Sequence, residues 1–137
     1  MMHPVIQEEN TGCAIASCAA IAHLSYQQMK DIANSIGIYA DDPSLWSDTR
    51  AIKNLLAQLG IPIVEEKKIF SRWDKLPDCA LLAIKWHSIA ELSFWHWVVF
   101  TRQAGQPYIL DSNAGLKHNL RTDFGRIKPK WFIEIVR

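Results

Sequence analysis

The chain lacks the features that would place it in a membrane or on a nucleic acid. No apolar run reaches the roughly 18 residues that span a bilayer, and residues 1–4 do not begin a secretory signal sequence. Neither sign of charge is in excess, because 15 basic and 14 acidic side chains leave a net charge of +1. Such a balance gives no attraction for nucleic acid or an anionic lipid surface. We expect a cytoplasmic protein with no membrane span and no nucleic-acid partner; secretion by a route that needs no signal sequence is compatible with the same features.

Cysteine is scarce as well, since the chain has only Cys13, Cys18 and Cys79. Three cysteines cannot all pair within one chain. Cys13 and Cys18 lie on one predicted helix, where a spacing of five residues would turn their side chains about 140° apart and disfavour a disulfide. No Cys or His pair has the spacing of zinc ligands, so we expect no metal and no cofactor. A chain of 137 residues can bury the core of a single domain without such supports.

The first part of the chain, residues 1–60, has helical periodicity. An alanine-rich run follows Cys13 and has almost no polar face, so this helix should be buried. A second helix, 26–36, begins at a Ser25 cap with a Gln three residues later, and a third follows the capping residues 47–49 and stops at Gly60. Between the second and third helices we expect an acidic loop over residues 39–46.

Residues 61–137 have strand-like patterns instead. A turn at 103–106 separates two of the runs and predicts a hairpin. Helices first and a mostly antiparallel sheet second predict an α+β fold, in which the N-terminal helices pack on the sheet within one domain, 1–137. The predicted strands are 61–69, 80–86, 94–101, 106–110 and 131–136.

Four residues are placed as the parts of a cysteine-based active site would be. Cys13 opens a helix, where the positive end of the helix dipole favours the thiolate. His96 lies in a predicted strand and would serve as the base, while Asp111 ends the next strand and could hold the other ring nitrogen of His96. Gln7, six residues before the cysteine, would bind the oxyanion together with the backbone N–H of Cys13; one such donor is typically worth ~3 kcal/mol of barrier.

Three segments carry a family resemblance. Residues 7–18 read QEENTGCAIASC, residues 96–100 read HWVVF and residues 109–112 read ILDS. They resemble the bacterial peptidases that remove double-glycine leader peptides, which belong to the papain-like superfamily and usually form the amino-terminal domain of peptide-exporting ABC transporters. The resemblance extends over nearly the whole chain. It implies a papain-like cysteine peptidase fold and a peptide or protein substrate, with Cys13 as nucleophile, His96 as base, Asp111 as orienting acid and Gln7 as oxyanion donor.

The chain departs from that family at two positions. The family typically places Gly after the nucleophile and Pro after the acid, whereas Ala14 and Ser112 stand there in this chain. No transporter segment follows, so we expect a stand-alone protein, and the family's role in export is not carried over. The resemblance implies hydrolysis without identifying a substrate.

Several residues have competing interpretations. His87 is the second candidate for the base, and Asn113 is an alternative orienting group. Asp111 could equally cap the turn that follows it. Cys18 and Cys79 fit a structural role. The tryptophans are core residues by default, and one or two of them could line the cleft; those in question are Trp46, Trp86, Trp95 and Trp97.

Two other functions fit the same residues. A papain-like transpeptidase or amidase would use the same thiolate with a different acceptor or amide. A catalytically silent peptide-binding module would keep the fold and the cleft without turnover, and the departures at Ala14 and Ser112 favour it. The chain has a suitable residue at each of the four catalytic positions, which favours the peptidase. No feature of the sequence defines the oligomeric state.

Overall fold

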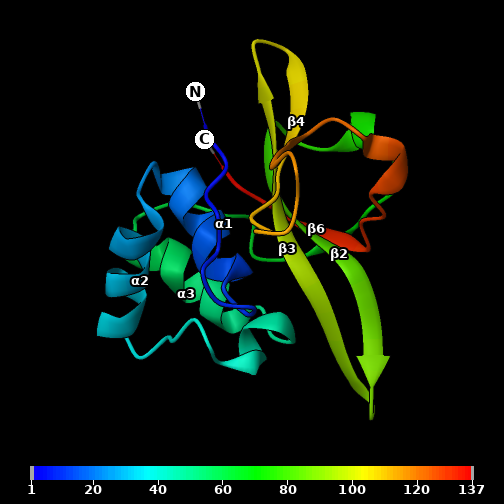
Figure 1. Cartoon of the computed structure of the whole chain (residues 1–137). Coiled ribbons are helices and arrows are strands. Elements are labelled where there is room, and N and C mark those ends of the chain that lie inside the picture. The colour runs from blue at the N-terminus through cyan, green and yellow to red at the C-terminus, as the bar shows by residue number, and fades with distance from the viewer. Residues whose placement is uncertain (1, 137) are drawn as a thin grey trace.

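A computed structural model describes residues 2–136, without the side chain of Trp46. Three α-helices lie on one side of a six-stranded sheet, and within the described residues every α-helix precedes Gly60 and every strand follows it (Figure 1). The α+β class predicted from the sequence is therefore confirmed. The α-helices are α1 (Cys13–Ala22), α2 (Tyr26–Ser35) and α3 (Arg50–Gln58).

All strand pairs are antiparallel, and the order across the sheet is β1-β6-β2-β3-β4-β5. The long β2–β3 hairpin extends well beyond the other strands (Figure 1). Short 3₁₀ turns connect the elements at Pro43–Trp46 (η1), Trp73–Lys75 (η2) and Phe124–Arg126 (η3). The strands are β1 (Lys68–Ile69), β2 (Cys79–Ile89), β3 (Leu92–Gln103), β4 (Gln106–Leu110), β5 (Leu120–Arg121) and β6 (Trp131–Glu134).

The helix predictions and the hairpin turn are confirmed to within a residue or two, but the predicted strand 61–69 is wrong over most of its length. Only Lys68 and Ile69 form a strand there, and Ile63 makes one isolated bridge to Ile135. Pro62 has no N–H to donate, and the charged, exposed run 65–68 offers no apolar face to bury. The two-residue strand β5 was not predicted, and β2 and β3 are longer than expected.

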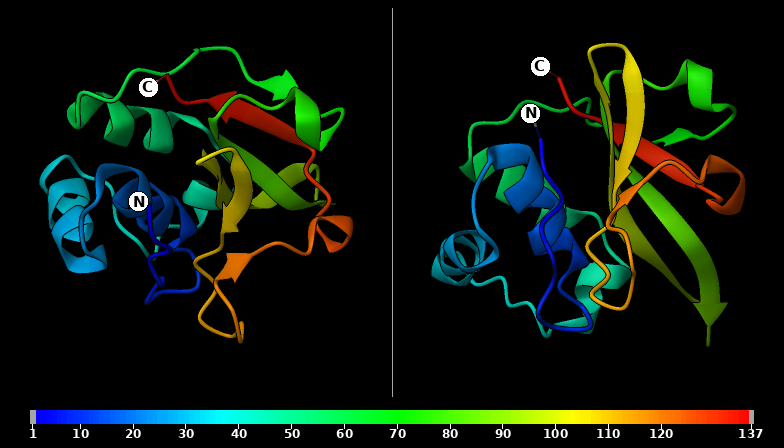
Figure 2. Two further views of the ribbon diagram at one scale, coloured as in Figure 1. Left: turned by 90° about the horizontal axis from the view of Figure 1, so that it is seen from above. Right: turned by 45° about the horizontal axis from the view of Figure 1, so that its top comes forward.

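The sheet separates two apolar clusters. The larger lies between the helices and the sheet, and α1 fills its centre: nine of its ten residues are buried, as its lack of a polar face predicts. Alternation along β3 sends Trp97 and Val99 into this cluster and Val98 and Phe100 into the smaller one on the opposite face. Figure 2 shows the helices stacked against one face of the twisted sheet. The start of α1 is thus fixed against β3.

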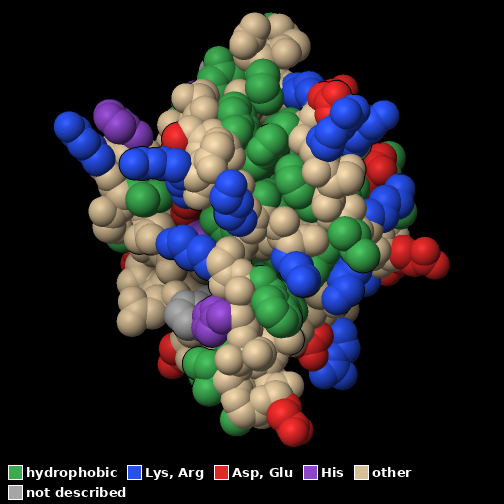
Figure 3. All heavy atoms as spheres, turned by 90° about the vertical axis from the view of Figure 1, so that its right-hand side faces the viewer, with side chains coloured by type: hydrophobic (Ala, Val, Ile, Leu, Met, Phe, Trp, Pro, Cys, Tyr) green, Lys and Arg blue, Asp and Glu red, His purple; other side chains and the backbone are tan. Residues whose placement is uncertain are grey.

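The opposite face of the sheet carries a cavity. It has a volume of about 640 Å³ and walls that include Trp73, Phe124 and Arg102. In Figure 3 this side of the molecule shows hydrophobic side chains among scattered lysines and arginines. Neither Cys13 nor His96 lines this cavity. This cavity is therefore separate from the residues that the sequence predicts to be catalytic.

Candidate active site

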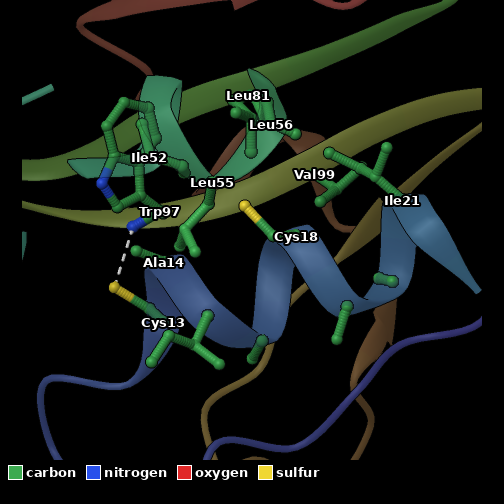
Figure 4. Close-up of a cluster of buried hydrophobic side chains, with 14 of the residues drawn as sticks. Cys13, Ala14, Cys18, Ile21, Ile52, Leu55, Leu56, Leu81, Trp97 and Val99 are labelled. Carbon is green, nitrogen blue, oxygen red and sulfur yellow. Dashed lines mark hydrogen bonds between the residues drawn. The ribbon is translucent and has the colours of Figure 1, made fainter. Parts of the chain in front are cut away.

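Cys13 is the first residue of α1, as predicted, and it is completely buried. Gly12 precedes it, and no side chain caps the helix start, so the dipole of α1 acts on the thiol without a competing cap. The backbone N–H of Trp97 in β3 donates to the Cys13 Sγ atom at 3.5 Å, the dashed line in Figure 4. The sulfur is therefore held between the start of the helix and the sheet.

The Trp97 N–H is available for this contact because of where β4 stops. β4 pairs with β3 from Val99 to Gln103, and the chain leaves the sheet after Leu110, the partner of Val99. Beyond that point no strand among the described residues pairs with β3 on its β4 side, and the start of α1 contacts β3 there through Cys13 and Trp97. Cys13, His96 and Asp111 meet at this gap in the sheet.

His96 and Asp111 form the hydrogen bond that the sequence predicts. The distance between His96 Nε2 and Asp111 Oδ1 is 2.7 Å; the Asp111 side chain is fully buried and that of His96 is 15% exposed. Nε2 is thereby occupied, which leaves Nδ1 for the thiol. Burial alone would lower the pKa of His96, but the hydrogen bond to Asp111 and the interaction with Cys13 outweigh burial and raise this pKa to about 9. The ring is therefore held as an imidazolium.

Asp111 has further partners that keep it ionised. Its Oδ1 accepts the backbone N–H of Asn113 at 3.1 Å, so the turn-capping role predicted for it coexists with the contact to His96. Its Oδ2 accepts from Arg121 Nη1 at 2.9 Å. Burial alone would raise the pKa of Asp111, but the hydrogen bond and charge of His96, with these two donors, lower it.

Arg121 is a site residue that reasoning from the sequence missed. It belongs to β5, its side chain is 14% exposed, and its guanidinium bridges Asp111 and Asp123. Two residues are too few to produce a strand pattern, so nothing in the sequence places Arg121 opposite the end of β4. Its proximity to the acid comes from the pairing of β5 with β4.

Gln7 lies beside the triad of Cys13, His96 and Asp111, but its side-chain amide is fully engaged in hydrogen bonds. Its side-chain Nε2 donates to the carbonyl oxygens of Glu9 at 2.9 Å and Asn10 at 3.0 Å, and its Oε1 accepts from the Ser112 hydroxyl at 2.7 Å. The Gln7 N–H also donates to the Ser112 carbonyl at 2.9 Å. An amide nitrogen has two hydrogens, so an oxyanion must displace one of these carbonyls. The oxyanion role of Gln7 stays a prediction.

The loop between Gln7 and Cys13 is braced from α2. The carboxylate of Glu9 accepts from the Tyr26 hydroxyl and pairs with the Lys30 ammonium group. A Cβ added to Gly12 would collide with the Tyr26 hydroxyl and lie 3.1 Å from the Glu9 carbonyl oxygen. Only glycine therefore fits between this brace and the start of α1.

A cavity of about 310 Å³ opens beside the triad. Of the tryptophans named from the sequence, Trp95 lines it, Trp97 is buried, Trp86 is 41% exposed, and the side chain of Trp46 lies outside the described part of the chain. The lining residues are Gln7, Asn10, Lys85, His87, Trp95, His96 and Asn113.

The alternative residues named from the sequence have other partners. His87 lines the cavity, but its Nδ1 contacts the Lys85 carbonyl oxygen at 2.9 Å and its ring stacks on Phe94. The side chain of Asn113 accepts from the Gly115 N–H at 2.9 Å. Cys18 points into the core between α1 and the sheet (Figure 4), where burial and the charge of Cys13 raise the pKa of its thiol. Cys79 begins β2 and is buried.

Among residues 2–136, no three His, Cys, Asp or Glu side chains gather in a way that could hold a metal ion. The described helices are also too short or too polar to cross a membrane. Comparison of the chain with protein-family models and with curated proteins finds no match. The site combines a thiol at a helix start with an imidazole that is hydrogen-bonded to a buried carboxylate.

Proposed function

We propose that the chain is a papain-like cysteine peptidase that hydrolyses a peptide bond. The observation that carries this proposal is the position of His96, whose Nε2 is bound to the buried Asp111 while its ring interacts with Cys13 at the start of α1. A buried carboxylate that fixes one ring nitrogen and leaves the other for a thiol is the arrangement that activates a nucleophile. The resemblance of segments 7–18, 96–100 and 109–112 to double-glycine leader peptidases points to the same chemistry.

In the proposed reaction the Cys13 thiolate attacks the carbonyl carbon of the scissile amide. The oxyanion forms beside the backbone N–H of Cys13 and the amide of Gln7, and as it collapses the His96 imidazolium gives its proton to the leaving amine. Water then attacks the thioester carbonyl while neutral His96 takes one of its protons, and the C–S bond breaks to release the acid and restore the Cys13 thiolate beside the His96 imidazolium. An amine in place of water would give a transpeptidase, and a side-chain or terminal amide as the substrate would make the same site an amidase.

Two observations favour the second candidate, a peptide-binding module without turnover. Cys13 is fully buried, and both amide hydrogens of Gln7 face backbone carbonyls. A peptidase has to expose the sulfur and free one of these hydrogens when the substrate arrives, whereas a binding module does neither. The reactivity of the thiol separates the two candidates.

The test is the rate of alkylation of Cys13 by iodoacetamide as a function of pH, read by mass spectrometry in the wild type and in His96→Ala. A peptidase should react rapidly at Cys13 well below pH 7 and lose this reactivity in the variant, because the thiolate depends on the imidazolium. Cys18 is the internal control, since burial keeps it as a thiol. If Cys13 reacts no faster than Cys18, the binding module is the better description.

A further inference from the structure

The β2–β3 hairpin has an irregularity directly beside the triad. Ile84 pairs with His96 and His87 pairs with Phe94, so three steps along β2 match two steps along β3. This extra residue makes a β-bulge, and Lys85 within it has a φ of 53°, a left-handed conformation that few residues other than glycine adopt. Bulges often turn side chains toward functional sites, and residues with a strained backbone often lie at such sites.

The bulge contributes two basic residues to the wall of the 310 Å³ cavity, Lys85 and His87. The other described lining residues carry amide, indole or imidazole groups, and none of them carries a carboxylate. Asp111 lies beneath His96, but it is fully buried and bound to His96 and Arg121. Among the described residues, the cavity wall therefore has basic side chains and no acidic ones, which suits a negatively charged group.

The cavity wall also holds a hydrogen-bond donor without a partner. Trp95 lines the cavity and is 6% exposed, and its indole Nε1 is buried with no hydrogen-bond partner among the described residues. Most buried donors in folded proteins are satisfied, and one that is not costs free energy. The Nε1 atom itself has almost no exposed surface, so the indole ring would have to turn toward the cavity before an oxygen atom of a ligand could satisfy it.

We propose that this cavity binds a carboxylate of the substrate, with Lys85 supplying the positive charge and the Trp95 indole N–H supplying a hydrogen bond. The inference rests on the proposed function, because it defines the peptides that the site accepts: those with a carboxylate close to the scissile bond. The carboxylate is either an acidic side chain or the free carboxyl terminus of the peptide.

Binding is tested by NMR in the full chain with Cys13→Ala, so that no turnover occurs. The probes are N-acetylglycylglycine and its terminal amide, and N-acetylglutamic acid amide and its glutamine counterpart. The Trp95 indole N–H resonance, assigned from its loss in Trp95→Phe, reports the contact. We expect one or both acids to shift this resonance, and we expect their neutral counterparts to leave it unchanged. A shift with N-acetylglycylglycine indicates a free carboxyl terminus as the ligand, and a shift with N-acetylglutamic acid amide indicates an acidic side chain.

Variants of the bulge test the role of charge. Lys85→Met should weaken binding of the acid about three- to fivefold, the amount expected for an exposed cation, and Lys85→Arg should restore it. Lys130→Met is the matched control. The Lys130 Nζ atom lies 4.7 Å from the ring centroid of Trp86, a residue of the same hairpin, but Lys130 does not line the cavity. It should leave binding unchanged.

The carboxylate site would be overturned if acid and amide shifted the Trp95 resonance equally, or if neither shifted it. Equal effects of Lys85→Met and Lys130→Met on binding of the acid would also overturn it. These outcomes are independent of catalysis. A reactive Cys13 in a protein that does not distinguish acid from amide would keep the peptidase and remove the carboxylate site. An unreactive Cys13 with clear discrimination would establish the site in a peptide-binding module.

Discussion

Arg121 donates to Asp111 on the oxygen that His96 does not use, at 2.9 Å and with the carboxylate completely buried. The acid of the triad therefore has one cation on each oxygen. Arg121 supports ionisation of Asp111, but its charge also opposes that of the His96 imidazolium. This relationship yields the first prediction.

Arg121→Gln should raise the pKa of His96 further, because it removes a positive charge close to the imidazolium. The same change leaves part of a buried carboxylate unpaired and should lower the free energy of unfolding by about 3 kcal/mol. NMR titration of the His96 ring and urea unfolding measure the two effects. Asp123→Asn, which removes the more exposed partner of Arg121, is the control and should change stability by less than about 1 kcal/mol. A variant with an unchanged His96 pKa would show that Arg121 has no part in the site.

The raised pKa of His96 should appear as a dependence of stability on pH. Burial opposes the charged ring, but Asp111 and Cys13 raise its pKa from 6.5 to about 9. A group with a raised folded-state pKa contributes stability that is complete below its unfolded pKa of about 6.5 and disappears as the pH rises through about 9. The free energy of unfolding of the wild type, relative to His96→Gln, should fall over this range by up to about 3 kcal/mol.

Cys13→Ala separates the two sources of that shift. It removes the thiol and keeps Asp111, so the decline in stability should be smaller and should occur at lower pH than in the wild type. Urea unfolding between pH 6 and pH 10 gives the unfolding free energies of the wild type, His96→Gln and Cys13→Ala. If the wild type and His96→Gln showed the same dependence on pH across the whole range, the raised pKa of His96 would be contradicted. Besides Asp111 and Cys13, the charged or titratable groups around the ring are Arg121, Lys85 and His87.

Gly12→Ala should displace the loop that precedes the nucleophile. The new methyl group would collide with the Tyr26 hydroxyl, which Glu9 holds in place, and we expect a loss of about 1–3 kcal/mol of stability together with a large fall in the reactivity of Cys13. Tyr26→Phe removes the colliding oxygen, so the double variant should be more stable than the sum of the two single changes predicts. Strict additivity would show that the collision is relieved in another way.

Gln7→Ala should lower kcat about 10²- to 10³-fold if the amide binds the oxyanion. The comparison is Ser112→Ala, which removes the hydroxyl that donates to Gln7 Oε1 but leaves the amide nitrogen in place. It should reduce kcat by less than tenfold. Peptide hydrolysis measured with both variants, alongside their unfolding free energies, separates a catalytic amide from a structural one. If the two variants lose equal activity and equal stability, Gln7 serves only to hold the loop.

Reasoning from the sequence located Cys13, His96 and Asp111 because local signals define all three positions. A helix start, a strand alternation and a short hairpin turn between β3 and β4 are readable in a few residues each. The turn is the decisive one, because its length sets the register between β3 and β4 and brings Asp111 within reach of His96. The contact between distant residues thus followed from a local feature.

The parts that the sequence did not reveal depend on pairing at long range. β5 has two residues, too few for a periodic pattern, so the approach of Arg121 to Asp111 could not be predicted. No glycine marks the bulge at Lys85, and its left-handed backbone follows from the pairing of β2 with β3. The strand predicted at 61–69 failed because Pro62 and the charged run 65–68 interrupt its apolar residues, so that only Lys68 and Ile69 form a strand with β6 and Ile63 makes a single bridge to Ile135.

The proposed catalytic residues and the residues of the bulge lie in parts of the fold that differ in how tightly they are packed. Cys13 and His96 are anchored where the almost entirely apolar helix α1 meets the middle of the sheet, so almost any change there disturbs the packing. Lys85 and His87 belong to a hairpin arm whose outer half is exposed to solvent. Substitutions in that arm can alter what the cavity accepts at little cost to folding. Under the proposed function, this architecture would allow the preference for one peptide over another to diversify, in nature or in the laboratory, while the residues proposed to act on the peptide stay constant.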